Sequence, residues 1–77
     1  MSITIKFFAS LRETIGKADT RLSADNIATA ADVWQAATDN HEHIPNMLIA
    51  INMGYANFDD AVKDGDEVAF FPPVTGG

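Results

Sequence analysis

The sequence contains no cysteine, and this absence most restricts how a chain of 77 residues can fold. Small domains often gain stability from disulfide bonds or from metal sites built on thiolates, and neither is open to this chain. It must be held together by side-chain packing alone, or by packing together with a partner protein. The missing thiol also excludes iron–sulfur clusters and a cysteine nucleophile.

A chain of this length forms one domain with a small core, which favours a binding module, a carrier or a subunit over an enzyme with a deep pocket. Its formal net charge is −6, from 11 acidic and 5 basic residues. We therefore expect it to avoid nucleic acid and membranes and to attract partners with a basic surface. With no signal-peptide pattern and no apolar run of about 20 residues, the expected location is the cytoplasm.

Five strands are predicted from the distribution of apolar residues. Ile3, Ile5 and Phe7 alternate with other residues at the period of a strand. The run 47–51 is apolar throughout and is typical of a buried central strand. Asp64-Gly65-Asp66 is a strong turn signal before the last strand. The predicted strands are residues 3–7, 20–22, 47–51, 55–58 and 67–71.

Two helices are predicted from capping signals. Ser10 precedes Glu13 by three residues, as in a capping box, and Gly16 suits the end of a short helix over 11–15. Thr29 and Asp32 have the same spacing and predict the main helix over 30–39. With Trp34 at its flank, the apolar stripe of that helix is predicted to be Val33, Ala36 and Ala37. The expected class is α+β, with one sheet packed on one main helix.

Six residues after the last strand are predicted to form a tail: Pro72, Pro73, Val74, Thr75, Gly76 and Gly77. The prolines favour an extended backbone, and the glycines have no Cβ, so this segment can thread into a narrow channel. Fully extended, it reaches about 20 Å. We predict a domain over residues 1–71 and a flexible tail over 72–77 with a free carboxylate at Gly77. A frayed terminus is the alternative interpretation.

Side-chain parity predicts aromatic rings that face away from the core beside this tail. If Phe7 and Phe70 face the core, then Phe8 and Phe71 point to the opposite side. Tyr55 is expected to join them in an exposed apolar patch, which is typical of a partner interface. The alternative is that a second helix or a loop covers these rings.

Two polar stretches could suggest metal sites. His41-Glu42-His43 lies in a predicted loop, and no third ligand stands at a suitable spacing. Asp59-Asp60, Asp64 and Asp66 lack the pattern of a calcium loop, so hydrogen bonding within turns and a solvated face explain them better. We therefore expect no bound metal.

Three stretches resemble the family of small subunits of molybdopterin synthase, which are ubiquitin-like sulfur carriers. They are FFASLRE at residues 7–13, AIN at 50–52 and DGDEVAFFPPVTGG at 64–77. The last match is the most specific, and the resemblance covers nearly the whole chain. Thiamine sulfur carriers also end in Gly-Gly, but they usually lack the Phe-Phe-Pro-Pro run.

The resemblance implies a ubiquitin-like β-grasp fold with a mixed sheet. It implies that an E1-like enzyme uses ATP to adenylate the Gly77 carboxylate, and that a persulfide protein supplies sulfur to make a thiocarboxylate, a C-terminal 1-thioglycine. The tail would then enter the active site of the large subunit in a heterotetramer. There the sulfur would build the dithiolene of molybdopterin from cyclic pyranopterin monophosphate. The small subunit would bind no cofactor and carry no catalytic side chain.

This chemistry is compatible with a chain that has no thiol. A terminal carboxylate is anionic and a poor electrophile at neutral pH, and adenylation removes its charge and supplies a leaving group. The thiocarboxylate that results is a soft nucleophile that needs no cysteine. Other hypotheses remain: a thiamine-type or tRNA-thiolation carrier, a ubiquitin-like modifier joined through Gly77 to a lysine, or an interaction domain with an inert tail.

Overall fold

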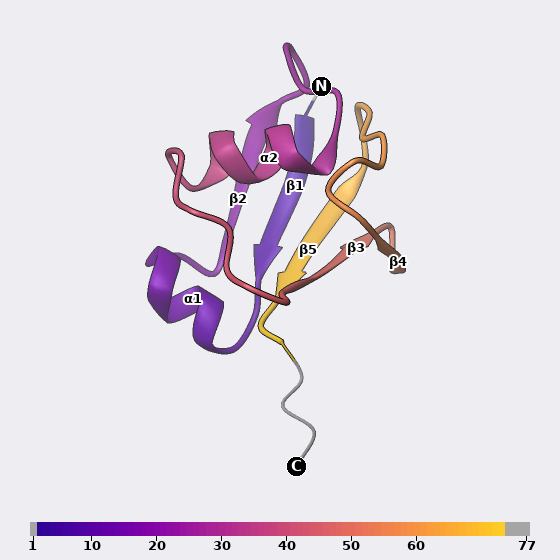
Figure 1. Cartoon of the computed structure of the whole chain (residues 1–77). Coiled ribbons are helices and arrows are strands. Elements are labelled where there is room, and N and C mark those ends of the chain that lie inside the picture. The colour runs from indigo at the N-terminus through magenta and orange to yellow at the C-terminus, as the bar shows by residue number, and fades with distance from the viewer. Residues whose placement is uncertain (1, 74–77) are drawn as a thin grey trace.

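The computed structural model describes residues 2–73, which form a five-stranded sheet and two helices (Figure 1). The strands are β1 (Ser2–Phe7), β2 (Asp19–Ser23), β3 (Leu48–Ile51), β4 (Gly54–Ala56) and β5 (Glu67–Phe71), and the helices are α1 (Ser10–Ile15) and α2 (Ala30–Ala37). The strand order is β2-β1-β5-β3-β4. The β1–β5 pair is parallel and the other pairs are antiparallel. The predicted α+β class with a mixed sheet is confirmed.

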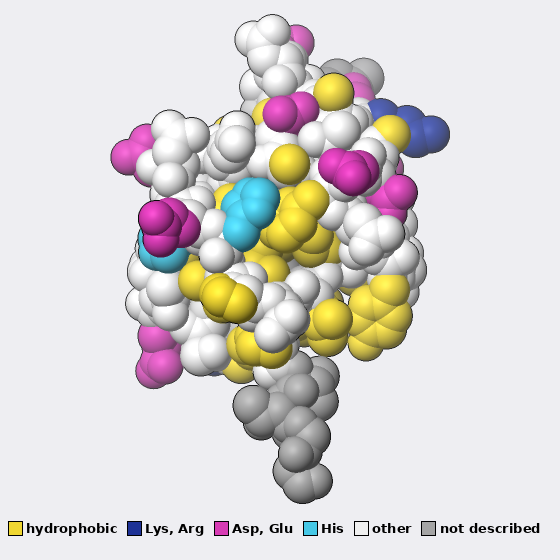
Figure 2. All heavy atoms as spheres, viewed as in Figure 1, with side chains coloured by type: hydrophobic (Ala, Val, Ile, Leu, Met, Phe, Trp, Pro, Cys, Tyr) yellow, Lys and Arg dark blue, Asp and Glu magenta, His cyan; other side chains and the backbone are white. Residues whose placement is uncertain are grey.

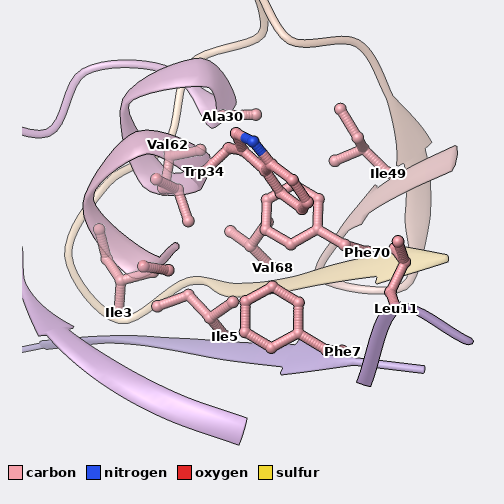
Figure 3. Close-up of a cluster of buried hydrophobic side chains, with 12 residues drawn as sticks. Ile3, Ile5, Phe7, Leu11, Ala30, Trp34, Ile49, Val62, Val68 and Phe70 are labelled. Carbon is pink, nitrogen blue, oxygen red and sulfur yellow. The ribbon is translucent and has the colours of Figure 1, made fainter. Parts of the chain in front are cut away.

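Helix α2 packs across one face of the sheet and closes an aromatic core (Figure 3). The Phe7 and Phe70 rings stack with centroids 5.8 Å apart, and Trp34 meets them edge-on at 6.2 and 5.0 Å. The indole N–H of Trp34 donates to the carbonyl of His41 at 2.8 Å, so the buried indole has no unsatisfied hydrogen-bond donor. The rest of the buried cluster consists of Ile3, Ile5, Leu11, Ala30, Val33, Ala37, Ile49, Val62 and Val68.

The main helix begins where it was predicted. The hydroxyl of Thr29 accepts from the backbone N–H of Asp32, and the carboxylate of Asp32 accepts from the N–H groups of Ala28 and Thr29. These bonds, that from Ala28 foremost, lower the pKa of Asp32. The predicted capping box is therefore confirmed.

The predicted end and buried face of this helix need correction. It ends at Ala37 rather than Asp39, because the Thr38 hydroxyl bonds back to the carbonyl of Trp34 and Asp39 takes a φ of 57°. Trp34 is fully buried, whereas Ala36 is exposed. Packing on the sheet therefore turns the large ring, and not the small alanine, toward the core.

The predicted capping box of α1 is wrong. The N-cap residue is Ala9, with φ 52°, and no side chain caps the helix, so Ser10 and Glu13 do not form the expected pair. The chain instead leaves β1 through a tight turn, in which the carbonyl of Phe8 accepts from the backbone N–H three residues on. Gly16 ends the helix in the left-handed region at φ 88°, as predicted.

The strand predictions hold in number and order but differ at their ends. The strand predicted over 55–58 runs instead from Gly54 to Ala56, because a two-residue turn leads into it at once. The run 47–51 is predicted to be a buried central strand, whereas the structure places β5 at the centre of the sheet and β3 beside it as an inner strand. β3 lies between β5 and the edge strand β4, and only Ile49 and Ala50 are buried in it.

A buried carboxylate ties the turn before β5 to the turn after β3. Asp66 is 8% exposed, and its carboxylate accepts from the backbone N–H of Lys63 and from the side-chain amide of Asn52, both at 2.9 Å. The side-chain oxygen of Asn52 accepts from the N–H of Glu67. These bonds, led by that from Lys63, lower the pKa of Asp66. For Asp66, the interpretation as turn chemistry is confirmed, but the predicted solvated face is wrong, because its hydrogen bonds hold the carboxylate in a buried position.

We predict that Asp66→Asn lowers the free energy of unfolding by about 1–3 kcal/mol at neutral pH, because two hydrogen bonds lose their charged acceptor. Since the folded pKa lies below the unfolded value of 3.8, the carboxylate stabilises the fold above about pH 4. This contribution is lost as the pH falls through the folded pKa. Urea unfolding of both proteins across this range measures the difference.

The matched control is Asp64→Asn, which removes an exposed carboxylate from the same turn. Its free energy of unfolding should stay within about 0.5 kcal/mol of the parent value. An Asp66→Asn deficit that does not shrink at acid pH would contradict the assignment.

Candidate functional site

The face of the sheet opposite α2 carries an apolar patch over β5, β3 and β4, and Phe8, directly after β1, borders it. Ala69 lies opposite Ala50, and Ala50 in turn lies opposite Tyr55, so small side chains occupy the middle and larger ones surround them. They leave a shallow hollow of about 280 Å³. We call this surface the outer apolar patch. Its residues are Phe8, Ala50, Met53, Tyr55, Glu67, Ala69 and Phe71.

The aromatic side chains of the patch lie as parity predicts. Phe8 and Phe71 stack with ring centroids 4.8 Å apart and planes 7° apart. Phe8 is 40% exposed, Phe71 is half-buried, and Tyr55 is 83% exposed. The outward orientation is confirmed. Within residues 2–73 these exposures also exclude the alternative that a helix or loop covers the rings.

An ion pair borders the patch toward β1. The Lys6 ammonium lies 3.8 Å from the Glu67 carboxylate, and both side chains are nearly half exposed. An ion pair with this exposure contributes little to stability. Its consequence is a charged rim beside an apolar centre, which is the usual composition of a protein–protein interface.

The predicted tail begins at the edge of the patch. Phe71 is the last residue of β5, and Pro72 and Pro73 follow it directly, half-buried and outside any helix or strand. The remaining tail residues, 74–77, lie outside the described residues. Their threading role and the reactive carboxylate of Gly77 therefore remain predictions.

The two histidines lie on the other side of the molecule and pack against aromatic rings. The ring of His43 stacks on Phe58 with centroids 4.0 Å apart, and both His41 and His43 meet the edge of Trp34 at 6.2 Å. Figure 2 shows histidine side chains against hydrophobic ones on the α2 side. Among the described residues, no three His, Asp or Glu side chains are grouped as metal ligands.

The side chain of Asp60 forms a hydrogen bond with the backbone of a nearby turn. Its carboxylate accepts from the N–H of Asn57 at 2.7 Å, which closes a turn. The interpretation as turn chemistry is confirmed for this residue also.

In the part of the chain that the structure describes, neither helix has the length and apolar character to cross a membrane.

Several members of the patch were not predicted from the sequence. The parity that places Phe71 outward also applies to Ala69 two residues earlier, and this signal was available. Ala50 depends on the register between β3 and β5, which the sequence does not display. Met53 is 94% exposed at the turn between β3 and β4, and only the position of that turn beside the patch identifies it.

Comparison with known proteins agrees with this architecture. The sequence model of the ThiS family matches residues 5–77. The molybdopterin synthase sulfur carrier subunit of Escherichia coli is 39% identical over 97% of this chain and 99% of its own length. The crystal structure of SAMP1 from Haloferax volcanii matches with a TM-score of 0.82 and 31% identity over the whole of both chains.

A chain in the complex of subunits 1 and 2 of molybdopterin-converting factor from Helicobacter pylori has the same fold, with a TM-score of 0.66 and 23% identity over both full chains. The structural neighbours have the ubiquitin-like β-grasp fold. That prediction is therefore confirmed for this chain.

We predict an energetic coupling between the stacked rings of the patch. In a double-mutant cycle of Phe8→Ala and Phe71→Ala, the coupling energy should be about 0.5–1.5 kcal/mol, as found for aromatic pairs in contact. Urea unfolding of the parent, both single variants and the double variant measures it. A cycle of Phe58→Ala with Phe71→Ala is the control, since Phe58 packs on the α2 side, and should be additive. Additivity in the first cycle would contradict the stacked geometry.

Proposed function

The chain belongs to the ThiS family, and from this membership we propose that it is the sulfur carrier subunit of a molybdopterin synthase. The observation that carries the proposal is the 39% identity to the Escherichia coli carrier subunit, which extends over almost the full length of both proteins. The outer apolar patch supports it, because this surface offers a larger subunit a docking site beside the root of the tail.

In this proposal, sulfur is carried on the main chain rather than on a side chain. An E1-like enzyme adenylates the Gly77 carboxylate with ATP and releases pyrophosphate. The outer sulfur of a persulfide protein displaces AMP, and a thiol then cleaves the resulting acyl disulfide, which leaves the thiocarboxylate and a disulfide. In the active site of the large subunit the thiocarboxylate sulfur attacks cyclic pyranopterin monophosphate, and water hydrolyses the thioester, which leaves sulfur on the pterin and returns the Gly77 carboxylate. The chain itself acts as a donor without catalytic side chains and without a bound cofactor. We place these steps in the cytoplasm.

Each part of the tail has a physical role in this transfer. Pro72 and Pro73 disfavour a return of the chain onto the sheet, because they lack N–H donors and restrict the backbone. Gly76 and Gly77 have no side chain to clash with a narrow channel. Val74 and Thr75 would span the distance between the patch and the reacting carbon. The docked patch would hold the tail in place while its tip reacts.

The second candidate function is protein modification. The likeness to SAMP1, named as a small archaeal modifier protein in a further solved structure from the same organism, favours it. In that function the activated Gly77 carbonyl would be attacked by a lysine of a target protein and would form an isopeptide bond. Both functions use the same adenylate, so the product formed from it distinguishes them. Thiamine-type and tRNA-thiolation carriers would share the thiocarboxylate and differ in the acceptor.

We predict that co-expression with the activating enzyme and a persulfide donor raises the intact mass of the chain by the difference between one sulfur and one oxygen atom. Mass spectrometry of the purified chain measures the change. Protein–protein conjugates without this mass change would replace the carrier with the modifier.

We further predict that deletion of Gly77, or addition of one residue after it, abolishes sulfur transfer. The melting temperature should stay within about 1–2 °C of the parent value, because the last residue of a chain usually contributes little to the stability of a fold. Transfer assays and thermal unfolding of the same samples separate the two effects. The substitution Asp25→Asn, in an exposed loop away from the patch, is the control for a generic surface change. Retained transfer after the deletion would refute the tail mechanism.

A further inference from the structure

The turn between β3 and β4 holds a methionine in a conformation that suits glycine. Ile51 and Gly54 pair across a two-residue turn, and its central residues Asn52 and Met53 have φ values of 51° and 72°. Hairpin turns with positive φ at both positions favour Asn followed by Gly. Asn52 meets this preference. Met53 does not, because its Cβ makes the left-handed region unfavourable.

The fold itself gives no reason for methionine at this position. The side chain of Asn52 joins the hydrogen bonds to Asp66 and Glu67 that tie the turns together. The side chain of Met53 is 94% exposed and therefore buries almost no apolar surface within the chain. Backbone strain at a residue whose side chain does not stabilise the fold points to a use outside it.

Met53 is positioned to extend the outer apolar patch. It lines the same hollow as Tyr55 and Phe71, at the end of the β3–β4 hairpin. Methionine is unbranched and polarisable, so it adapts to the shape of an apolar pocket in a partner. Its nearly full exposure leaves most of its apolar surface free for burial in an interface.

The short reach of the tail restricts where its partner can bind relative to Met53. Six extended residues span about 20 Å, so a protein that takes Gly77 into its active site must lie close to Pro72. Phe71, directly before Pro72, lines the patch together with Met53. A large subunit that receives the tail therefore contacts the Phe71 end of the patch, and it meets Met53 where this contact extends across the hollow to the β3–β4 turn.

We propose that Met53 is an anchor residue for the large subunit, whose surface supplies an apolar socket for the thioether at the end of the hollow opposite the Phe8–Phe71 pair. This inference rests on the proposed function and adds to it a specificity-determining contact. The turn fixes the backbone of Met53 before binding, so the conformational cost of forming the complex at this residue is confined to its side-chain rotamers.

The test is Met53→Gly in the full-length chain, with binding to the cognate large subunit measured by calorimetry. The Kd should rise about tenfold or more through the loss of a buried methionine. The melting temperature should rise by a few degrees, because glycine relieves the strain. Weaker binding by a more stable protein distinguishes an anchor from a structural residue. Met53→Leu retains the apolar side chain and should keep the Kd within about threefold of the parent value.

Asn26→Gly is the matched control, since Asn26 is exposed with φ 65° in a loop outside the patch. It should leave the Kd unchanged. An unchanged Kd for Met53→Gly, or a lower melting temperature, would overturn the anchor. In that case the sulfur-carrier function still stands, provided that the parent chain forms the thiocarboxylate when it is co-expressed with its activating enzyme. Absence of both thiocarboxylate and large-subunit binding in the parent would overturn the two proposals together.

Discussion

The parallel pairing of β1 with β5 determines both faces of the sheet. Phe7 lies opposite Phe70 in this pairing, and Trp34 covers the two rings from α2. Because side chains alternate along a strand, the next residues, Phe8 and Phe71, meet on the other face. A shift of one residue in either strand would bring a core ring to the surface. The core and the outer apolar patch therefore follow from a single register.

The same pairing explains how a domain this small would support the proposed transfer reaction, although its described residues form only a shallow hollow on this face. β5 lies in the middle of the sheet, and the tail follows it directly, so the chain leaves the domain beside a broad apolar surface rather than at a sheet edge. A partner that binds this surface can take up the tail and supply the pocket itself. In the proposed mechanism the reactive sulfur is added to Gly77 after synthesis. The mechanism therefore needs no cysteine, and the chain has none.

Local signals predicted local features well, while packing decided the rest. The pair Thr29 and Asp32 forms its capping box because the interaction needs only the residues of one turn. The similar signal at Ser10 fails because the turn out of β1 imposes a different backbone. Trp34 and not Ala36 lies on the buried face of α2, because packing against the sheet sets the rotation of the helix about its own axis. In the patch, the outward aromatic pair followed from alternation alone, but the central alanines required the strand register.

In the proposed mechanism the C-terminal carboxylate carries sulfur to the pterin substrate. A single-turnover reaction can follow this sulfur: the chain, loaded with isotopically labelled sulfur, is mixed with the large subunit and cyclic pyranopterin monophosphate. We expect the label to leave the chain and to appear in the dithiolene of molybdopterin, and only when the large subunit is present. Label that stays on the chain, or a chain that becomes joined to lysine instead, would contradict the account.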